Sequence, residues 1–145
     1  MRVPATRTLE NALRRVGFAH VAGCDEVGRG CLAGPVVAAA VVLHPDRHIA
    51  GVCDSKLVPA PERERLHDRI VRHAVAWAVA SADPGEIDRI NIHQASLRAM
   101  QRAVLLLAPL PDIVLVDAFR VPDLPMAQRG VRHGDRRCAA IAAAS

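Results

Sequence analysis

Residues 20–43 read HVAGCDEVGRGCLAGPVVAAAVVL, and this stretch decides the fold more than any other. A first apolar run ends at two adjacent acids, Asp25 and Glu26, and a second, β-branched run fills residues 36–43. Apolar runs of this length are typical of buried strands. The segment between them is rich in glycine, contains Pro35 and is too short to hold a helix. We therefore predict two neighbouring antiparallel strands.

Helices and strands alternate along the rest of the chain. Apolar runs bounded by turn residues predict strands at residues 20–26, 36–43, 75–80, 113–116 and 129–132. Apolar residues at helical spacing predict one helix capped by Thr6 or Thr8, a second at residues 59–73 and a third from Asn91 to Pro109. This order predicts a mixed α/β sheet. The length fits a single domain covering the whole chain, residues 1–145.

The third predicted helix carries the clearest pattern. Residues at helical spacing share one face, so its stripe should pack on the core, and we assign Met100 to that core rather than to a cofactor contact. The stripe consists of Leu97, Met100, Val104 and Leu107. The first predicted helix has a similar stripe of Leu9, Leu13 and Val16. The strand predicted at residues 75–80 is ended by Asp83-Pro84-Gly85.

The composition is that of a soluble globular protein. Apolar residues make up 51% of the 145 and charged residues 23%. The net charge of +4 favours a polyanionic partner only mildly. Nearly all basic residues are arginine, with Lys56 the sole lysine, and a biased nucleotide composition of the genome also produces such an excess of arginine. The four cysteines form no CxxC pair, so a zinc site and a disulfide framework are both disfavoured. No membrane span or signal peptide is predicted.

The glycines after Glu26 permit a dinucleotide-binding interpretation, which we reject. Gly28-x-Gly30-x-x-Ala33 matches the relaxed glycine pattern of such sites. That pattern needs a helix N-terminus to receive the pyrophosphate, whereas the segment that follows is β-branched and contains Pro35. The two acids would also repel the pyrophosphate.

Acids at the ends of predicted strands indicate a metal site instead. Asp25 and Glu26 end one strand, Asp117 ends another and Asp135 follows a third. Carboxylates that converge at one sheet edge repel one another unless cations balance them, and Mg²⁺ prefers oxygen ligands. Two such ions can activate a water and stabilise the leaving oxygen of a phosphodiester. Neighbours on a strand point to opposite faces, so Asp25 and Glu26 reach one site only where their strand bends or ends.

Spacing alone does not select these four acids. A single acid at a strand end is commonly a turn residue or a cap. The alternatives that remain open on spacing are Asp54, Asp112 and Asp123.

Several blocks of sequence together resemble one family, bacterial ribonuclease HII, in order and over nearly the whole chain. The first block, VAGCDEVGRGCLAGPVVAAAVVL, is long and highly specific. The later blocks are DSKL, EIDRINIHQASLRAMQRAV, PDIVLVDA, RVPDLPMA and HGD followed by IAAAS. The resemblance implies a ribonuclease H-like fold, a mixed sheet of about five strands flanked by helices.

The resemblance also implies an activity. The family cleaves the phosphodiester 5′ of a ribonucleotide in RNA–DNA hybrids or in duplex DNA and leaves a 3′-hydroxyl and a 5′-phosphate. Such cleavage removes misincorporated ribonucleotides and RNA primers. The family's metal-binding, catalytic carboxylates fall on Asp25, Glu26, Asp117 and Asp135, with Mg²⁺ or Mn²⁺ as the expected ion. We therefore expect a cytoplasmic, monomeric enzyme with a nucleic-acid substrate.

The substrate contacts implied by the resemblance follow the first two acids closely. Backbone groups of Gly28, Arg29 and Gly30 would contact the ribose 2′-hydroxyl, the group that distinguishes RNA from DNA. Arg29 would face a phosphate, and Lys56 in the DSKL block would touch the nucleic-acid backbone. We assign His93 no role beyond its helix.

The sequence departs from the family at several positions. Cys31 replaces a usual Pro, Ala118 a usual Gly and His133 a usual Lys, and the DSKL block has one lysine fewer. The family continues into further helices with a junction-stacking tyrosine, whereas this sequence has no Tyr and stops within IAAAS. We therefore expect a sequence incomplete at its C-terminus. The alternative function is an inactive nucleic-acid-binding fragment, whose sheet could keep an uncovered apolar face.

Overall fold

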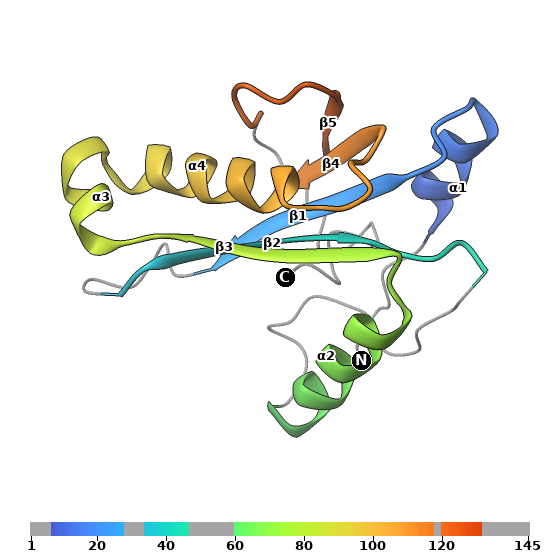
Figure 1. Cartoon of the computed structure of the whole chain (residues 1–145), viewed down its shortest axis with the longest axis horizontal. Helices are drawn as coiled ribbons and strands as arrows, with labels where there is room; N and C mark the ends of the chain where they lie inside the picture. Colours follow the sequence, from blue (N-terminus) through green and yellow to red (C-terminus); the bar gives the residue numbers. More distant parts are fainter. Residues whose placement is uncertain (1–6, 28–33, 47–59, 118–119, 132–145) are drawn as a thin grey trace.

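The computed structural model describes residues 7–27, 34–46, 60–117 and 120–131, and these form a five-stranded sheet with flanking helices (Figure 1). The strands are β1 (Val21–Val27), β2 (Val36–Val42), β3 (Ala76–Ala82), β4 (Ile113–Asp117) and β5 (Ala127–Val131). The helices are α1 (Thr8–Arg15), α2 (Ala60–His73), α3 (Pro84–Ile90) and α4 (Ile92–Leu105). The predicted α/β class is confirmed.

The sheet has strand order β3-β2-β1-β4-β5 and mixes both pairing directions. β1 pairs with β2 and β2 with β3 in antiparallel fashion, which confirms the predicted antiparallel pair. β1 pairs with β4 and β4 with β5 in parallel. A parallel neighbour requires a crossover connection, and α3 and α4 supply it between β3 and β4. The crossover brings the ends of β1 and β4 to the same edge of the sheet.

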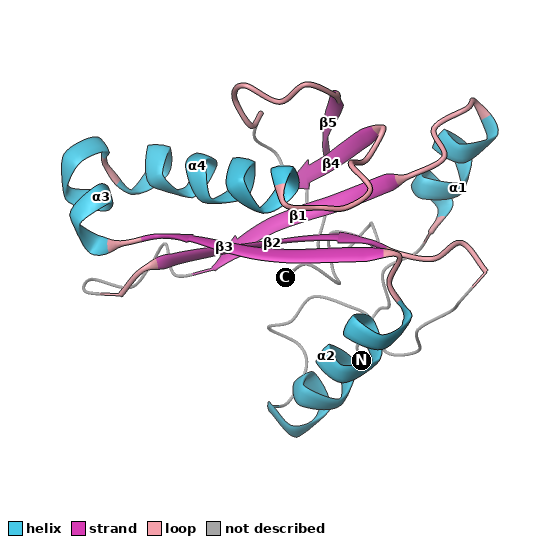
Figure 2. Cartoon of the chain, in the orientation of Figure 1, coloured by secondary structure: helices cyan, strands magenta, loops and turns pink. Residues whose placement is uncertain are grey.

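One face of the sheet is covered by α4, which lies along the strands (Figure 2). The predicted stripe of α4 is buried there, with Met100 2% exposed and Val104 fully buried. The strands and α4 meet through small side chains, which let helix and sheet approach closely. These are Ala22, Ala38, Ala40, Ala95, Ala99 and Ala103. Met100 is therefore a core residue, as predicted.

The opposite face carries a second apolar cluster, and Figure 1 shows α2 on the side of the sheet away from α4. Leu43 and Leu115 are buried in it, and apolar residues of α1 and α2 pack against it, namely Leu9, Leu13, Leu66 and Ile70. On the edge strand β3 the cover is incomplete. Trp77 is 45% exposed and Val79 50% exposed, at alternate positions of the strand.

The segment Asp83-Pro84-Gly85 follows the end of β3, as predicted, and also begins a helix that the sequence patterns did not predict. Asp83 is the N-cap of α3, and its Oδ1 accepts a hydrogen bond of 2.8 Å from the Glu86 amide. Pro84 occupies the first turn, where the missing N–H costs nothing. An Asp-Pro pair fits a helix start as well as a turn, and no apolar stripe in so short a helix separates the two.

Two details of the other predicted helices also need correction. The N-cap of α1 is Arg7, which makes no side-chain cap hydrogen bond, so Thr8 is not the cap; Thr6 lies outside the described residues. Val16 follows the helix and is 73% exposed, so it is not part of the apolar stripe. α4 ends at Leu105, because the Pro109 ring would clash with the carbonyl four residues earlier.

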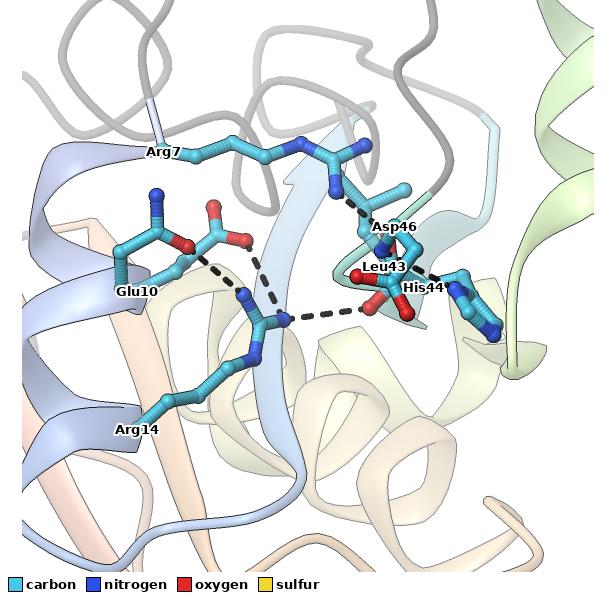
Figure 3. A network of polar contacts seen from close by, with 7 residues as sticks. Arg7, Glu10, Arg14, Leu43, His44 and Asp46 are labelled. Carbon is cyan, nitrogen blue, oxygen red and sulfur yellow. Dashed lines mark hydrogen bonds and ion pairs between the residues drawn. The ribbon is translucent and has the colours of Figure 1, made fainter.

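Polar contacts tie α1 to the end of β2 (Figure 3). Arg7 Nη1 donates to the main-chain oxygen of His44, and Arg14 Nη2 donates to that of Leu43 at 3.2 Å. Arg14 also lies 3.9 Å from Glu10, a fully buried acid of the same helix. The register of β1 with β2 places this end of the sheet opposite the end that holds the β1 acids. The network is therefore part of the scaffold rather than of the candidate site.

Candidate active site

The parallel pairing of β1 with β4 brings two of the predicted acids together. Cys24 is the register partner of Val116, so the next residues, Asp25 and Asp117, occupy neighbouring positions on adjacent strands. Adjacent strands lie about 4.8 Å apart. Two acids separated by 92 positions in the sequence therefore meet at one edge of the sheet.

Glu26 has a different position. β1 continues through Val27, which pairs with Val37, so the strand does not end at the acids. The pleat then places Glu26 on the surface that holds the buried Cys24, and Asp25 on the opposite surface. Asp25 Oδ1 accepts a hydrogen bond of 2.9 Å from the Glu26 amide. The pairing of β1 with β2 is uninterrupted at the two acids, so no bulge brings both carboxylates to one surface.

The two acids lie beside a buried thiol. Both side chains are half-buried, and the thiol of Cys24 lies fully buried next to them in the chain. Burial raises the pKa of the Cys24 thiol, and the negative charges of Asp25 and Glu26 raise that pKa further. Cys24 is a free, buried thiol that packs in the core cluster beneath α4.

The structure separates one of the alternative acids, Asp112, from this edge. Asp112 precedes β4, and its carboxylate accepts a hydrogen bond of 2.8 Å from the His20 amide. It lies at the other end of the strand from Asp117, roughly 16 Å away at the usual rise per residue. Asp123 belongs to the loop after β4, in a left-handed conformation with φ of 57°. Asp25 and Asp117 are the acids that the sheet itself juxtaposes.

The remaining predicted site residues lie outside the described residues. They are Gly28, Arg29, Gly30, Lys56 and Asp135, together with the third alternative acid, Asp54. Among the described residues, no group of three or more acidic, histidine or cysteine side chains could hold a metal ion. His93 lies in α4, as predicted.

Sequence patterns missed one polar contact of the described sheet, that of Gln128 in β5, which pairs with Val114, three residues before Asp117. Its side-chain amide makes two hydrogen bonds of 2.7 Å to the main chain of Val121, in the loop that follows β4. A single glutamine in a short edge strand carries no periodic signal, so only the tertiary contact reveals it.

Comparison with known proteins decides the family. The model of the family "Ribonuclease HII" matches residues 22–145. The chain belongs to the ribonuclease HII family. The resemblance seen in the first block and its successors is thereby confirmed. The described part of this family member contains no helix both long and apolar enough to cross a membrane.

A curated ribonuclease HII from Solibacter usitatus (strain Ellin6076) is 52% identical over 138 residues, which are 95% of this chain and 60% of that relative. The chain thus spans less than two thirds of that relative's length. Among solved structures, the ribonuclease H2 from Pyrococcus horikoshii OT3 aligns with a TM-score of 0.74 at 24% identity, over 86% of this chain and 68% of that one. Bst-RNase HIII in complex with Mn²⁺ aligns with a TM-score of 0.71 at 23% identity, over 91% of this chain and 51% of that one. These two likenesses confirm the ribonuclease H-like fold.

Proposed function

We propose that residues 1–145 carry the catalytic domain of an endoribonuclease. It hydrolyses the phosphodiester 5′ of a ribonucleotide, in RNA–DNA hybrids or within duplex DNA, and leaves a 3′-hydroxyl and a 5′-phosphate. Membership of the ribonuclease HII family supports the reaction class. The observation that carries the site is the register of β1 with β4, which sets Asp25 beside Asp117. Removal of misincorporated ribonucleotides and RNA primers by a cytoplasmic monomer belongs to the same proposal.

Divalent cations fit the chemistry of the proposed ligands. The ligands would be Asp25, Glu26, Asp117 and Asp135, all carboxylates and thus hard oxygen donors that suit Mg²⁺ or Mn²⁺. Carboxylates carried at neighbouring positions of adjacent strands repel each other unless a cation balances their charges. When bound, two such ions activate water and stabilise the leaving oxygen of a phosphodiester. Mn²⁺ is the ion named for the Bst-RNase HIII neighbour.

The chain's own residues would divide the remaining work. Asp25 lies at the strand position next to Asp117. Glu26 lies on the other surface of β1, so its contribution to metal binding would be measured with a variant of its own. Gly28, Arg29 and Gly30 follow within four residues of Glu26, so the amides that would contact a ribose 2′-hydroxyl stay close to the acids. Lys56 would contact the nucleic-acid backbone.

Mn²⁺ titration of the 145-residue chain by calorimetry tests the metal site directly. We expect wild type to bind Mn²⁺ and the Asp25→Asn and Asp117→Asn variants to lose at least tenfold in affinity. Asp123→Asn is the matched control, because it makes the same change in the loop after β4, where asparagine tolerates the left-handed backbone. Unchanged Mn²⁺ affinity in the Asp117→Asn variant contradicts the proposal.

Cleavage of a DNA duplex that contains one ribonucleotide tests the reaction. Because the chain spans 60% of the Solibacter relative, we expect weak or no cleavage by the 145-residue chain and robust cleavage once it is extended to the relatives' length. In the extended protein Asp117→Asn should abolish cleavage and Asp123→Asn should preserve it. A product with a 3′-phosphate would exclude the proposed reaction.

A second candidate function is an inactive nucleic-acid-binding fragment. The exposure of Trp77 and Val79 on the sheet favours it, because the apolar face of the described residues is incompletely covered. This candidate predicts that the chain binds an RNA–DNA hybrid but cleaves none, and that Asp117→Asn leaves binding unchanged. Fluorescence anisotropy with a labelled hybrid, run beside the cleavage assay, distinguishes the two functions.

A further inference from the structure

Three arginines of α3 and α4 lie around one buried glutamate. Glu86 is 8% exposed, and Arg102 donates to both of its carboxylate oxygens. The hydrogen bonds from Arg102 lower the pKa of Glu86 against the effect of burial, and the positive charges of Arg102, Arg98 and Arg89 lower that pKa further. The charge of Asp83, a second acid beside this group, acts on Arg102. Three guanidinium groups and two carboxylates leave the group with a net positive charge.

The positive charge is presented to solvent by Arg89 and Arg98. Both side chains are exposed, and within the described ranges no hydrogen bond or ion pair occupies either of them. The remaining acid of α3, Asp88, follows Glu86 by two positions. Two positions are more than half a helical turn, so Asp88 lies on the other side of α3 from Glu86. The surface shared by α3 and α4 is therefore basic over its buried acid.

This surface lies at the end of the sheet that carries the β1 acids. Arg102 Nη1 donates to the main-chain oxygen of Ser81 at 2.9 Å. Ser81 pairs with Val37, which also pairs with Val27, the residue after Glu26. Glu26 shares the sheet surface that α4 covers, and Figure 1 shows α3 beyond this end of the sheet. Because β3 and β1 are two strand spacings of about 4.8 Å apart, roughly 10 Å separates Ser81 from Val27.

The chemistry of the surface suits a phosphate group. Guanidinium groups bind phosphate oxygens through parallel, charge-assisted hydrogen bonds. Successive phosphates of one strand of a duplex rise by about 3.4 Å along the helix axis, so roughly 10 Å corresponds to about three nucleotides. A duplex whose scissile phosphate lies at the acids would therefore place phosphates from about three positions away beside α3 and α4.

We propose that Arg89 and Arg98 contact the phosphate backbone of the substrate duplex to one side of the cleaved bond. This inference rests on the proposed function, and it adds a surface of α3 and α4 to the substrate contacts expected from residues 28–30 and 56. Phosphates carry no base identity, so the two arginines add affinity for every duplex and leave recognition of the ribonucleotide to other residues.

Fluorescence anisotropy with a labelled duplex in EDTA measures this contact without the metal site. Titrations with the 145-residue chain are repeated between about 50 and 200 mM NaCl, because log K falls against log salt with a slope of about −0.9 for each phosphate contact. Arg89→Gln and Arg98→Gln should each reduce the slope by about 0.9, and the double variant by about 1.8. Arg98→Lys keeps the charge and should keep the wild-type slope.

Arg72→Gln is the matched control. Arg72 is also an exposed helical arginine, but it lies in the last turn of α2, on the side of the sheet away from α4. This variant should keep the wild-type slope. Equal slopes for the Arg89→Gln, Arg98→Gln double variant and Arg72→Gln overturn the inference, and so does a wild-type chain that binds no duplex. A loss confined to RNA-containing duplexes also overturns it, because a backbone contact acts on DNA–DNA and RNA–DNA duplexes alike.

The two proposals fail in different ways. If Asp117→Asn leaves Mn²⁺ affinity unchanged, the proposed function fails, and the salt slopes still decide whether Arg89 and Arg98 contact a duplex. If Mn²⁺ binding behaves as proposed but the double variant keeps the wild-type slope, only the phosphate contact fails. The double variant should bind Mn²⁺ like wild type, which separates a lost contact from a lost fold. If the double variant does not fold, the two single variants decide by the same limits.

Discussion

Glu86 of α3 and Arg102 of α4 are joined by two parallel hydrogen bonds, with Arg102 Nη1 donating to Glu86 Oε1 at 2.7 Å and Nη2 donating to Oε2. Arg102 Nη1 also donates to the main-chain oxygen of Ser81 in β3 at 2.9 Å. One side chain therefore connects two helices and the edge of the sheet. The hydrogen bonds from Arg102 lower the pKa of Glu86 below its ordinary value.

The lowered pKa of Glu86 predicts an acid-dependent loss of stability. The folded state favours the ionised carboxylate, so the stabilisation is present above the ordinary carboxyl pKa of about 4.3 and is lost as the pH falls through the lower folded value. Arg102 is 42% exposed, so we expect the pair to contribute roughly 1 kcal/mol. Urea unfolding of wild type and Glu86→Gln should differ by this amount near pH 7 and converge at acidic pH.

Arg102→Met provides the second arm of a double-mutant cycle. The double variant Glu86→Gln, Arg102→Met should lose less free energy of unfolding than the sum of the single variants, because both remove the same contact. Additive losses at pH 7 would show that the two side chains do not interact in solution.

Two leucines that differ in burial test the core assignment. Leu115 of β4 is fully buried in the second cluster, whereas Leu106 is 63% exposed after α4. Leu115→Ala should lower the free energy of unfolding by about 2–5 kcal/mol, through lost burial and the cavity it leaves. Leu106→Ala makes the same chemical change and should stay within about 0.5 kcal/mol. Equal losses in chemical denaturation would contradict the packing described for this face.

Asn91 between α3 and α4 combines a cap with an unfavourable backbone. Its φ is 83° and ψ 164°, a region nearly restricted to glycine, and its side chain accepts a hydrogen bond of 2.9 Å from the Gln94 amide. Asn91→Ala loses the cap and keeps the strain, so we expect a loss of about 1–2 kcal/mol. Asn91→Gly loses the cap and relieves the strain, so it should lie closer to wild type. Thermal unfolding that ranks glycine below alanine would contradict this account.

Cys24 should resist alkylation in the folded protein. Its side chain is fully buried, and that burial raises the pKa of the thiol, so neither access nor thiolate favours reaction at neutral pH. We expect iodoacetamide at pH 7.5 to modify Cys24 only after unfolding in urea, as measured on its peptide by mass spectrometry. Rapid modification of Cys24 in native buffer would show that the end of β1 opens more readily than its packing indicates.

The long elements were predictable because their patterns are repeated many times. The apolar stripe of α4 has helical spacing, and the apolar runs of β2 and β4 have the length of buried strands. Each contains enough apolar residues to exclude the other type of secondary structure. The start of α3 was missed because Asp83-Pro84 fits a turn and a helix cap alike. Val16 was assigned to an apolar face because spacing does not show where a helix ends, and the structure ends α1 one residue earlier.

The candidate site likewise combines features that local sequence patterns predict with features that they do not. The adjacent acids, the glycines that follow them and the family blocks are local features, so the sequence by itself determined the family, the class of fold and the candidate ligands. Which acids meet depends on strand order and register, since residues 92 positions apart become neighbours only through the parallel pairing of β1 with β4. Only the tertiary structure shows that Asp25 and Asp117 occupy neighbouring strand positions while Asp112 lies at the other end of β4. It also sets Glu26 on the opposite surface through the pleat and reveals the two hydrogen bonds between Gln128 and Val121. These relations are long-range, and no local pattern encodes them.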